Sequence, residues 1–367
     1  MPKIALVLSA GAARGAYEAG VFAAMVERFT AIHGRAPRFR YLVGTSIGGL
    51  EITMLAGEAA TPDIGAGKLI QLWNSISPDQ AFSIGIGSLM GLPRLLLGGG
   101  KKPHGVVSTA PLAALIERSA TWGNVRANVA SGVLGAVALG ALQVRSARTK
   151  FFVETADEDI NFAAMNAESA HKGYCFEPAT IRASHALATG AIPLAFPPVD
   201  IDGDFYMDGG SRAMDPYDVA VSMGASHVFG IGTVKQAANG ALRGGAFGEG
   251  PPSALAVMGL VVSSYFDAQR DLAVLQARGA QGFYIAPSES LGELAARFLA
   301  SGEGWKSRSL FSRIAYAVMN PRGGSEGEVA SNMIFEPGYA KALIALGRRD
   351  LEARWTEVHA FLIDGGA

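Results

Sequence analysis

The chain has only one cysteine, Cys175, among its 367 residues. A single thiol excludes an internal disulfide, so the fold depends on its apolar core rather than on covalent cross-links. Cys–His catalysis built on this thiol would need a motif, and none is recognisable. Charge is also scarce: 17% of the residues are charged, and 31 basic side chains nearly cancel 32 acidic ones. No overall field therefore draws the chain to nucleic acid, and we expect no nucleic-acid partner.

Metal-binding and targeting patterns are absent from the sequence as well. Histidine, cysteine, aspartate and glutamate nowhere cluster at ligand spacing, so we expect no metal and no other cofactor. The first residues lead directly into an apolar run without a signal peptide, which favours a cytoplasmic protein. The mean hydropathy of +0.24 is high for such a protein. It is consistent with peripheral contact to membranes or micelles.

Two long apolar segments stand out, at 83–100 and at 127–144. The second is an uncharged run of 18 residues, counting both ends, in which only Asn128, Ser131 and Gln143 are polar. It reaches the lower limit of a membrane span, but its glycines and alanines make it weakly hydrophobic. A buried hairpin or helix, a mobile cap over a pocket, and an element that dips into lipid all stay open.

Strand and helix patterns alternate along the chain, which is typical of an α/β fold with a mostly parallel sheet and helices on both faces. The length fits one domain over 1–367. The sequence predicts strands near 4–8, 39–43, 151–155, 227–232 and 282–286. It predicts helices near 15–31, 46–58, 111–119, 183–189, 215–223, 253–279 and 338–363.

The pentapeptide Gly44-Thr45-Ser46-Ile47-Gly48 follows the apolar run Tyr41-Leu42-Val43 and precedes a helix-forming stretch. This context is typical of a nucleophile elbow, a tight strand-to-helix turn that lifts one serine hydroxyl clear of the backbone. Glycines flank the serine because side chains there would collide with the bent chain. A plain glycine-rich turn is the alternative.

A loop of small residues, Ser9 to Gly15, joins the first predicted strand to the first predicted helix. Free backbone N–H groups at a helix N-terminus suit an anion. The glycines do not follow Gly-x-Gly-x-x-Gly, and no acidic residue follows at the distance that a dinucleotide fold requires. An oxyanion hole for Ser46 is the better interpretation.

Two further blocks lie downstream. The stretch from Ala183 to Pro198 indicates a short helix that ends at prolines. Tyr206-Met207-Asp208-Gly209-Gly210 ends in an aspartate followed by two glycines, a pattern that by itself indicates only a turn.

Taken in order, these four blocks resemble the patatin-like phospholipases, a family of lipid acyl hydrolases. The resemblance implies a three-layer α/β fold and a Ser–Asp dyad, with Ser46 as nucleophile and Asp208 as its base. It places the oxyanion hole at Ala10, Gly11, Ala12, Arg14 and Gly15, and the elbow glycines at Gly44 and Gly48. None of the six histidines lies in a triad context. His185 falls inside the family's helix block, where a structural role is the better interpretation.

The oxyanion loop departs from the family pattern. That pattern has three consecutive glycines, then any residue, a basic residue and glycine, whereas this chain has Ala10-Gly11-Ala12-Ala13-Arg14-Gly15. If either alanine needs a positive φ, the loop is strained by roughly 1 kcal/mol or more. Arg14 could steady the loop, meet a phosphate head group or lie on the surface.

The resemblance implies hydrolysis of carboxylic esters of phospholipids or related lipids through an acyl-enzyme. The expected partner is therefore a lipid or fatty-acyl ester. Acyl transfer by the same dyad is one alternative, and a non-catalytic lipid-binding protein with an impaired oxyanion hole is another. The apolar segments 83–100 and 127–144 look like additions to the family core, and the C-terminal region 253–367 is expected to be helical.

Overall fold

The computed structural model describes residues 2–78, 108–193, 195–235, 273–302 and 324–367. Within them, nine strands form one sheet, whose main path runs β5-β4-β3-β2-β1-β8-β9, with β7 paired to β3 and β6 paired to β7. The strands are β1 (Ile4–Leu8), β2 (Tyr41–Thr45), β3 (Ala136–Gln143), β4 (Arg148–Thr155), β5 (Tyr174–Pro178), β6 (Val199–Ile201), β7 (Asp204–Asp208), β8 (His227–Ile231) and β9 (Gln281–Ile285).

Pairing is parallel from β3 through β2, β1 and β8 to β9, and between β4 and β5. It is antiparallel where β3 meets β4 and β7, and between β6 and β7. The sheet is therefore mixed but mostly parallel, and the predicted α/β fold class is confirmed.

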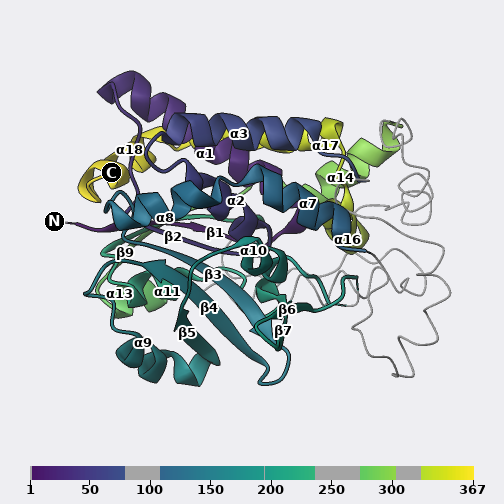
Figure 1. Ribbon diagram of the computed structural model, residues 1–367. Helices are drawn as coiled ribbons and strands as arrows, with labels where there is room; N and C mark the ends of the chain where they lie inside the picture. The colour runs from purple at the N-terminus through teal and green to yellow at the C-terminus, as the bar shows by residue number, and fades with distance from the viewer. Residues whose placement is uncertain (1, 79–107, 194, 236–272, 303–323) are drawn as a thin grey trace, which may run out of the picture.

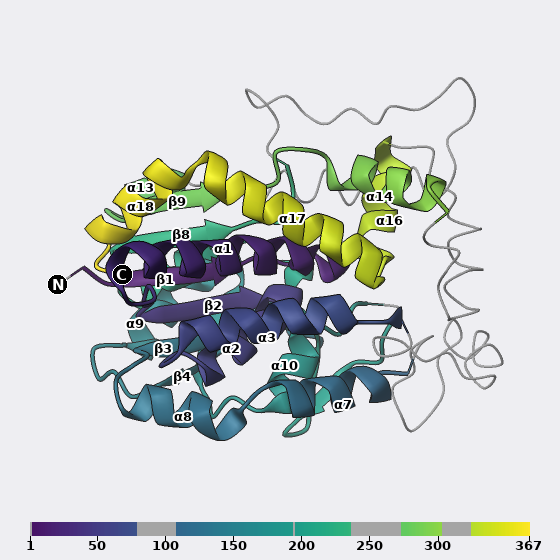
Figure 2. The ribbon, with the colours of Figure 1, turned by 90° about the horizontal axis from the view of Figure 1, so that it is seen from above.

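Helices cover both faces of this sheet (Figures 1 and 2). On the upper face in Figure 1 lie α1 (Gly15–His33), α2 (Ile47–Gly57), α3 (Pro62–Ser75), α7 (Ala110–Ser119), α8 (Trp122–Ala130), α17 (Pro337–Ala353) and α18 (Trp355–Asp364). On the lower face lie α9 (Phe162–Ser169), α11 (Tyr217–Ser222) and α13 (Ala273–Ala277). The remaining helices are η1 (Ala12–Arg14), η2 (Ala170–Lys172), α10 (Ala183–Thr189), η3 (Gly209–Ser211), α14 (Leu291–Ala300) and α16 (Gly324–Met333).

The alternation of side chains along β1 shows how the two layers are filled. Leu6 and Leu8 join the core beneath α1, α2 and α17, whereas Ala5 and Val7 join the core on the other face. Successive side chains of a strand point to opposite faces, so a strand with apolar residues at every position must be covered on both sides. The continuous apolar run in the sequence reflects this double burial.

The apolar run 127–144 is neither a lid nor a lipid-facing insert. Its second half is β3, which lies between β2 and β4 in the sheet. Its first half ends α8, where Val129 is buried. The cap and lipid-dipping interpretations are therefore wrong, because β3 lies in the middle of the sheet and α8 packs against α2. Within the described ranges, no helix is both long enough and apolar enough to cross a membrane.

Other differences are smaller. The helix predicted over 338–363 is two helices, because the chain leaves helical geometry at Arg354, with φ −114° and ψ 15°, between α17 and α18. Most of the predicted helix 253–279 and all of the apolar segment 83–100 lie outside the described residues.

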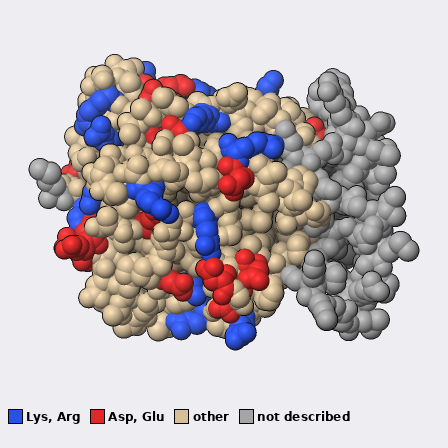
Figure 3. Space-filling view, viewed as in Figure 1, with Lys and Arg blue, Asp and Glu red and all other residues tan. Residues whose placement is uncertain are grey.

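Charge is sparse and mixed on the face shown in Figure 3, where small groups of acidic and basic side chains lie among wide uncharged areas. This agrees with the formal net charge of −1.

Candidate active site

The turn between β2 and α2 places Ser46 at the N-terminus of α2 with φ 55° and ψ −128°. A serine rarely adopts this conformation, and such strain persists only where surrounding contacts enforce it. A side chain at Gly44 would meet the carbonyl oxygen of Gly48 at 2.5 Å, and one at Gly48 would meet the carbonyl oxygen of Leu8 at 2.5 Å. Glycine is therefore required at both flanks, as expected for a nucleophile elbow.

The hydroxyl of Ser46 donates a hydrogen bond to Asp208 Oδ2 at 2.6 Å. The other carboxylate oxygen, Oδ1, accepts a hydrogen bond from the Gly210 amide at 2.7 Å. Both side chains are buried, each with 5% of its surface exposed. The Gly210 amide therefore fixes one oxygen of the Asp208 carboxylate, and the other oxygen faces the Ser46 hydroxyl.

Burial raises the pKa of Asp208 to about 6, although the hydrogen bonds from Ser46 and Gly210 oppose the rise. A carboxylate with this pKa is ionised at neutral pH and is a stronger proton acceptor than an ordinary aspartate. An aspartate that acted as a base in place of histidine would need this property.

The described histidines are engaged elsewhere. His185 accepts a hydrogen bond from the Arg182 amide at 3.1 Å, and burial lowers its pKa to about 4. His33 Nε2 lies 2.9 Å from His359 Nε2, and the His227 ring is within hydrogen-bond distance of Ser226 and Asp364. Of the described histidines, none forms a hydrogen bond with Ser46 or Asp208; His104 lies outside the described residues.

Thr189, at the end of α10, holds Ser46 in place. Its hydroxyl accepts a hydrogen bond from the Ser46 amide at 2.9 Å and donates one to the Gly140 carbonyl oxygen at 2.6 Å. The side chain is fully buried. Thr189 thus connects the strained elbow to the central strand β3.

The loop before α1 presents fewer free amides than its length suggests. The Ala10 amide donates to the Met214 carbonyl oxygen, and the Arg14 amide donates to the Gly11 carbonyl oxygen, both at 3.0 Å. The Gly15 amide donates to the Ala12 carbonyl oxygen. The expectation that all five residues supply the hole is therefore too wide, because three of these N–H groups are already bonded. Gly11 and Ala12 are the remaining candidates.

Ala12 adopts φ 50°, the left-handed conformation that disfavours a side chain. It also lines the same pocket as Ser46. The predicted strain is therefore present at one of the two alanines that replace glycines. Arg14 is neither a surface residue nor free to meet a head group, because its side chain is fully buried and bound to Glu328 and Ser331.

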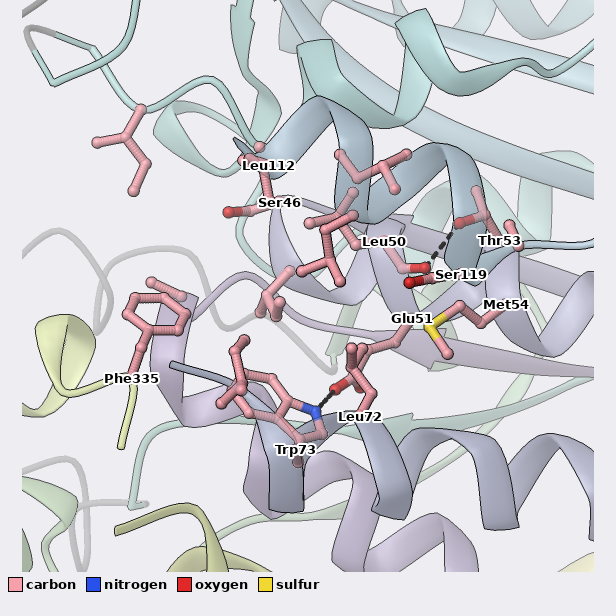
Figure 4. A pocket seen from close by; sticks show the side chains of 18 of the residues that line it. Ser46, Leu50, Glu51, Thr53, Met54, Leu72, Trp73, Leu112, Ser119 and Phe335 are labelled. Carbon is pink, nitrogen blue, oxygen red and sulfur yellow. Dashed lines mark hydrogen bonds between the residues drawn. The ribbon is translucent and has the colours of Figure 1, made fainter. Parts of the chain in front are cut away.

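Ser46 opens into an apolar pocket with about 780 Å³ of empty space (Figure 4). Helices α2, α3 and α7 form most of its wall, and Phe335 closes one side. The apolar side chains that line it include Leu50, Met54, Leu72, Trp73, Ile76, Leu112, Leu115 and Ile116. The apolar lining of this pocket suits a hydrocarbon chain.

One ionisable group, Glu51, is part of this wall and was not predicted as a site residue. Trp73 Nε1 donates to Glu51 Oε1 at 2.6 Å. Burial raises the pKa of the Glu51 carboxyl above its usual range, which favours its neutral form. A neutral carboxyl in this wall suits an apolar occupant of the pocket.

The sequence model of the patatin-like phospholipases matches residues 6–221, more than half of the chain. The chain belongs to the patatin-like phospholipase family. Ser46, Asp208 and the loop before α1 all lie within the matched part of this patatin-like protein. The residues that hold Arg14 lie beyond it. A search of curated proteins finds no match.

Among solved structures, this patatin-like protein is similar to VipD from Legionella pneumophila, with 13% identity and a TM-score of 0.31, over 64% of this chain and 51% of that one. It is also similar to the type III effector protein ExoU, with 13% identity and a TM-score of 0.24, over 87% of this chain and 62% of that one. The chain thus spans about half to three fifths of their lengths. Neither likeness is close enough to inform the substrate of this protein.

The structure brings together Ser46, Asp208, Ala12 and the elbow glycines, which sequence reasoning had singled out. Thr189, Glu51 and Trp73 were missed. A signal for Trp73 existed, since Ala66, Leu69 and Trp73 recur at helical spacing and are all buried on one side of α3. No comparable signal marks Thr189 or Glu51. Among the described residues, no group of three or more histidine, cysteine, aspartate or glutamate side chains could hold a metal ion.

Proposed function

We propose that this patatin-like protein is a serine lipid acyl hydrolase that cleaves carboxylic esters of phospholipids or related lipids. The observation that carries the proposal is the 2.6 Å hydrogen bond from Ser46 to Asp208 at the opening of an apolar pocket. A serine hydroxyl is a weak nucleophile until a neighbouring base accepts its proton. Asp208 is within reach of that proton and has a pKa suited to the transfer.

In the first half of the reaction, Ser46 Oγ bonds to the ester carbonyl carbon while its proton moves to Asp208. The negative charge that develops on the carbonyl oxygen is held by the amides of Gly11 and Ala12. Each well-aimed donor of this kind contributes roughly 2.7–4 kcal/mol of transition-state stabilisation. The carbon–oxygen bond to the alcohol then breaks, and the alcohol leaves with the proton from Asp208.

In the second half, Asp208 accepts a proton from a water molecule, whose oxygen attacks the acyl-enzyme. Collapse of that intermediate breaks the bond to Ser46, which recovers its proton, and the fatty acid is released. The acyl chain lies among Leu50, Met54 and Trp73 during both steps. Burial of the acyl chain away from water favours binding by about 25 cal/mol per Å² of apolar surface buried.

The test compares purified wild-type protein with Ser46→Ala on p-nitrophenyl esters of increasing acyl length and on phosphatidylcholine vesicles. We expect the wild type to release p-nitrophenol and free fatty acid. We expect Ser46→Ala to be inactive, with an unchanged circular dichroism spectrum. Turnover by a folded Ser46→Ala protein would contradict the role of Ser46. A wild type that binds vesicles without turnover would favour the non-catalytic alternative.

Product analysis with an added alcohol separates hydrolysis from acyl transfer. If the protein is a hydrolase, free fatty acid stays the main product when glycerol or a lysophospholipid is supplied. If an ester of the added alcohol dominates instead, the protein is an acyltransferase that uses the same Ser46 chemistry.

A further inference from the structure

The side chain of Arg14, two residues after Ala12, is enclosed by residues from the other end of the chain. Arg14 Nε donates to Ser331 Oγ at 2.8 Å, and Nη2 donates to the Glu328 carbonyl oxygen at 2.8 Å. The same Nη2 pairs with the Glu328 carboxylate. Arg14 is fully buried, and Ser331 likewise.

These partners belong to α16, which contacts η1, the short helix that contains Ala12 and Arg14. A second anchor, Thr233, donates its hydroxyl hydrogen to the Ala10 carbonyl oxygen at 2.6 Å. Both anchors follow residue 221, where the family match ends. The loop is therefore held by parts of this chain that the family pattern does not include.

The need for such anchors follows from the loop itself. Ala12 occupies a left-handed conformation that is unfavourable for alanine. A strained residue keeps its conformation only when neighbouring contacts leave it no alternative. Arg14 supplies those contacts on the C-terminal side of Ala12, since its guanidinium is fixed by a carboxylate, a carbonyl oxygen and a hydroxyl.

We infer that α16 is part of the catalytic apparatus, with Glu328 and Ser331 acting as positioning residues that aim the Ala12 amide by holding Arg14. This inference rests on the proposed function. It predicts that loss of these contacts lowers kcat, because the oxyanion donor is misaimed, while KM for a short ester changes little. Misplacement by about 1 Å can cost up to roughly 100-fold in rate.

A purely structural role makes a different prediction, and paired substitutions separate the two. Removing one partner of a buried ion pair leaves an uncompensated charge and destabilises a protein strongly, whereas replacing both with apolar residues restores stability. We therefore compare Arg14→Met and Glu328→Leu with the double variant that carries both. We expect the single variants to have a lowered Tm. We expect the double variant to recover Tm to within a few degrees of the wild type but to keep a kcat reduced about tenfold or more.

Ser331→Ala gives a second, milder test, because it removes one contact to Arg14 and leaves both charges in place. We expect a several-fold lower kcat with unchanged KM, measured well below Tm. This variant also excludes a direct effect of the Arg14 charge on the oxyanion. The matched control is Glu27→Gln, which breaks the exposed Glu27–Arg348 ion pair between α1 and α17, at 2.6 Å. We expect wild-type kcat from the control.

The outcomes are distinct from those that test the proposed function. An inactive wild type, or an active Ser46→Ala variant, would contradict the proposed function itself. An active wild type with an inactive Ser46→Ala leaves the function standing. In that case, recovery of kcat together with Tm in the double variant overturns the role of α16. If the double variant does not fold, a wild-type kcat in Ser331→Ala overturns it equally.

Discussion

Ser46 and Asp208 are 162 positions apart in the chain, yet the Ser46 hydroxyl donates a hydrogen bond of 2.6 Å to Asp208. The strand β3, to which neither residue belongs, sets this distance. On β3, Gly140 pairs with Thr45 of β2, and the next residue, Ala141, pairs with Asp208 of β7. Adjacent residues of β3 therefore place the ends of β2 and β7 side by side. The proposed Ser–Asp dyad therefore depends on strand register as well as on the local turn at Ser46.

The two members of the dyad should act as one unit. Asp208→Asn keeps the shape of the side chain but cannot accept the Ser46 proton, so we expect a loss of kcat close to that of Ser46→Ala. Because residues that act together are strongly non-additive, the double variant should be scarcely worse than either single variant. Steady-state kinetics on a p-nitrophenyl ester provide the measurement. Losses that multiply would show that Asp208 does not work on Ser46.

Activity should fall in mild acid with a midpoint near pH 6. Asp208 must be ionised to accept a proton, and burial raises its pKa from 3.8 to about 6. Below that pH the carboxyl is protonated, so kcat/KM of a neutral ester should drop about tenfold for each further pH unit. A midpoint near 4 would mean that the carboxylate is solvated during catalysis and that the buried geometry does not persist.

The control for this profile is Glu51→Gln. Glu51 lines the same pocket, and burial raises its pKa, so its ionisation would act on the alkaline side of the profile. We expect the acid limb to be unchanged in Glu51→Gln, since Glu51 is already neutral at pH 6. A shifted acid limb would assign part of the titration to Glu51.

Thr189→Val should lower kcat by roughly tenfold, because it leaves the buried Ser46 amide without its acceptor. The variant has nearly the same volume, so the loss should come from the hydroxyl and not from packing. Thr189→Ser, which retains the hydroxyl, should recover most of the rate. Equal rates for the valine and serine variants, at equal Tm, would show that this hydroxyl does not position Ser46.

Ala12→Gly should stabilise the protein by about 1 kcal/mol and leave kcat unchanged or higher. Glycine adopts the observed φ of 50° without the steric cost that alanine carries there. Urea unfolding at neutral pH gives the free energy difference. A lower stability would indicate that contacts of the Ala12 methyl group outweigh the backbone strain.

Part of the sheet could be predicted because some of its parallel strands have clear boundaries in the sequence. Ile4–Leu8 and His227–Ile231 are short apolar runs that follow and precede turn residues, and both were placed within one residue. The α10 helix, 183–189, was also predicted with its observed bounds, because prolines follow it. Patterns of this kind can be interpreted from neighbouring residues alone, without the rest of the fold.

β3 was not predicted from the sequence because its residues reflect complete burial and do not show the pattern of a half-exposed strand. A strand that is paired on both edges and covered on both faces shows no alternation of polar and apolar residues. Its run is mostly alanine, leucine and glycine, with Val137 as its one β-branched residue, and β-branched residues are those that favour a strand. The same uncharged composition is typical of a lid or a membrane-facing helix, so the pattern alone could not distinguish core from surface.

Tertiary contacts also explain the break between α17 and α18. Arg354 donates to the Tyr284 carbonyl oxygen at 2.8 Å, and its guanidinium lies 4.4 Å from the centre of the Phe283 ring. Both partners belong to β9, so the chain bends where it meets the sheet. Long-range contacts of this type also fix Arg14 and Thr189, which is why their roles could not be derived from spacing.

The pairing of β3 with both β2 and β7 has a consequence for how the protein matures. A chain emerging from the ribosome carries Ser46 early, but the serine has no base until residues 204–208 have been synthesised and have joined the sheet. Pairings between distant segments generally form late in folding. A reactive probe that labels only an activated Ser46 would therefore report when β7 has joined β3, and chains truncated before residue 204 would not be labelled.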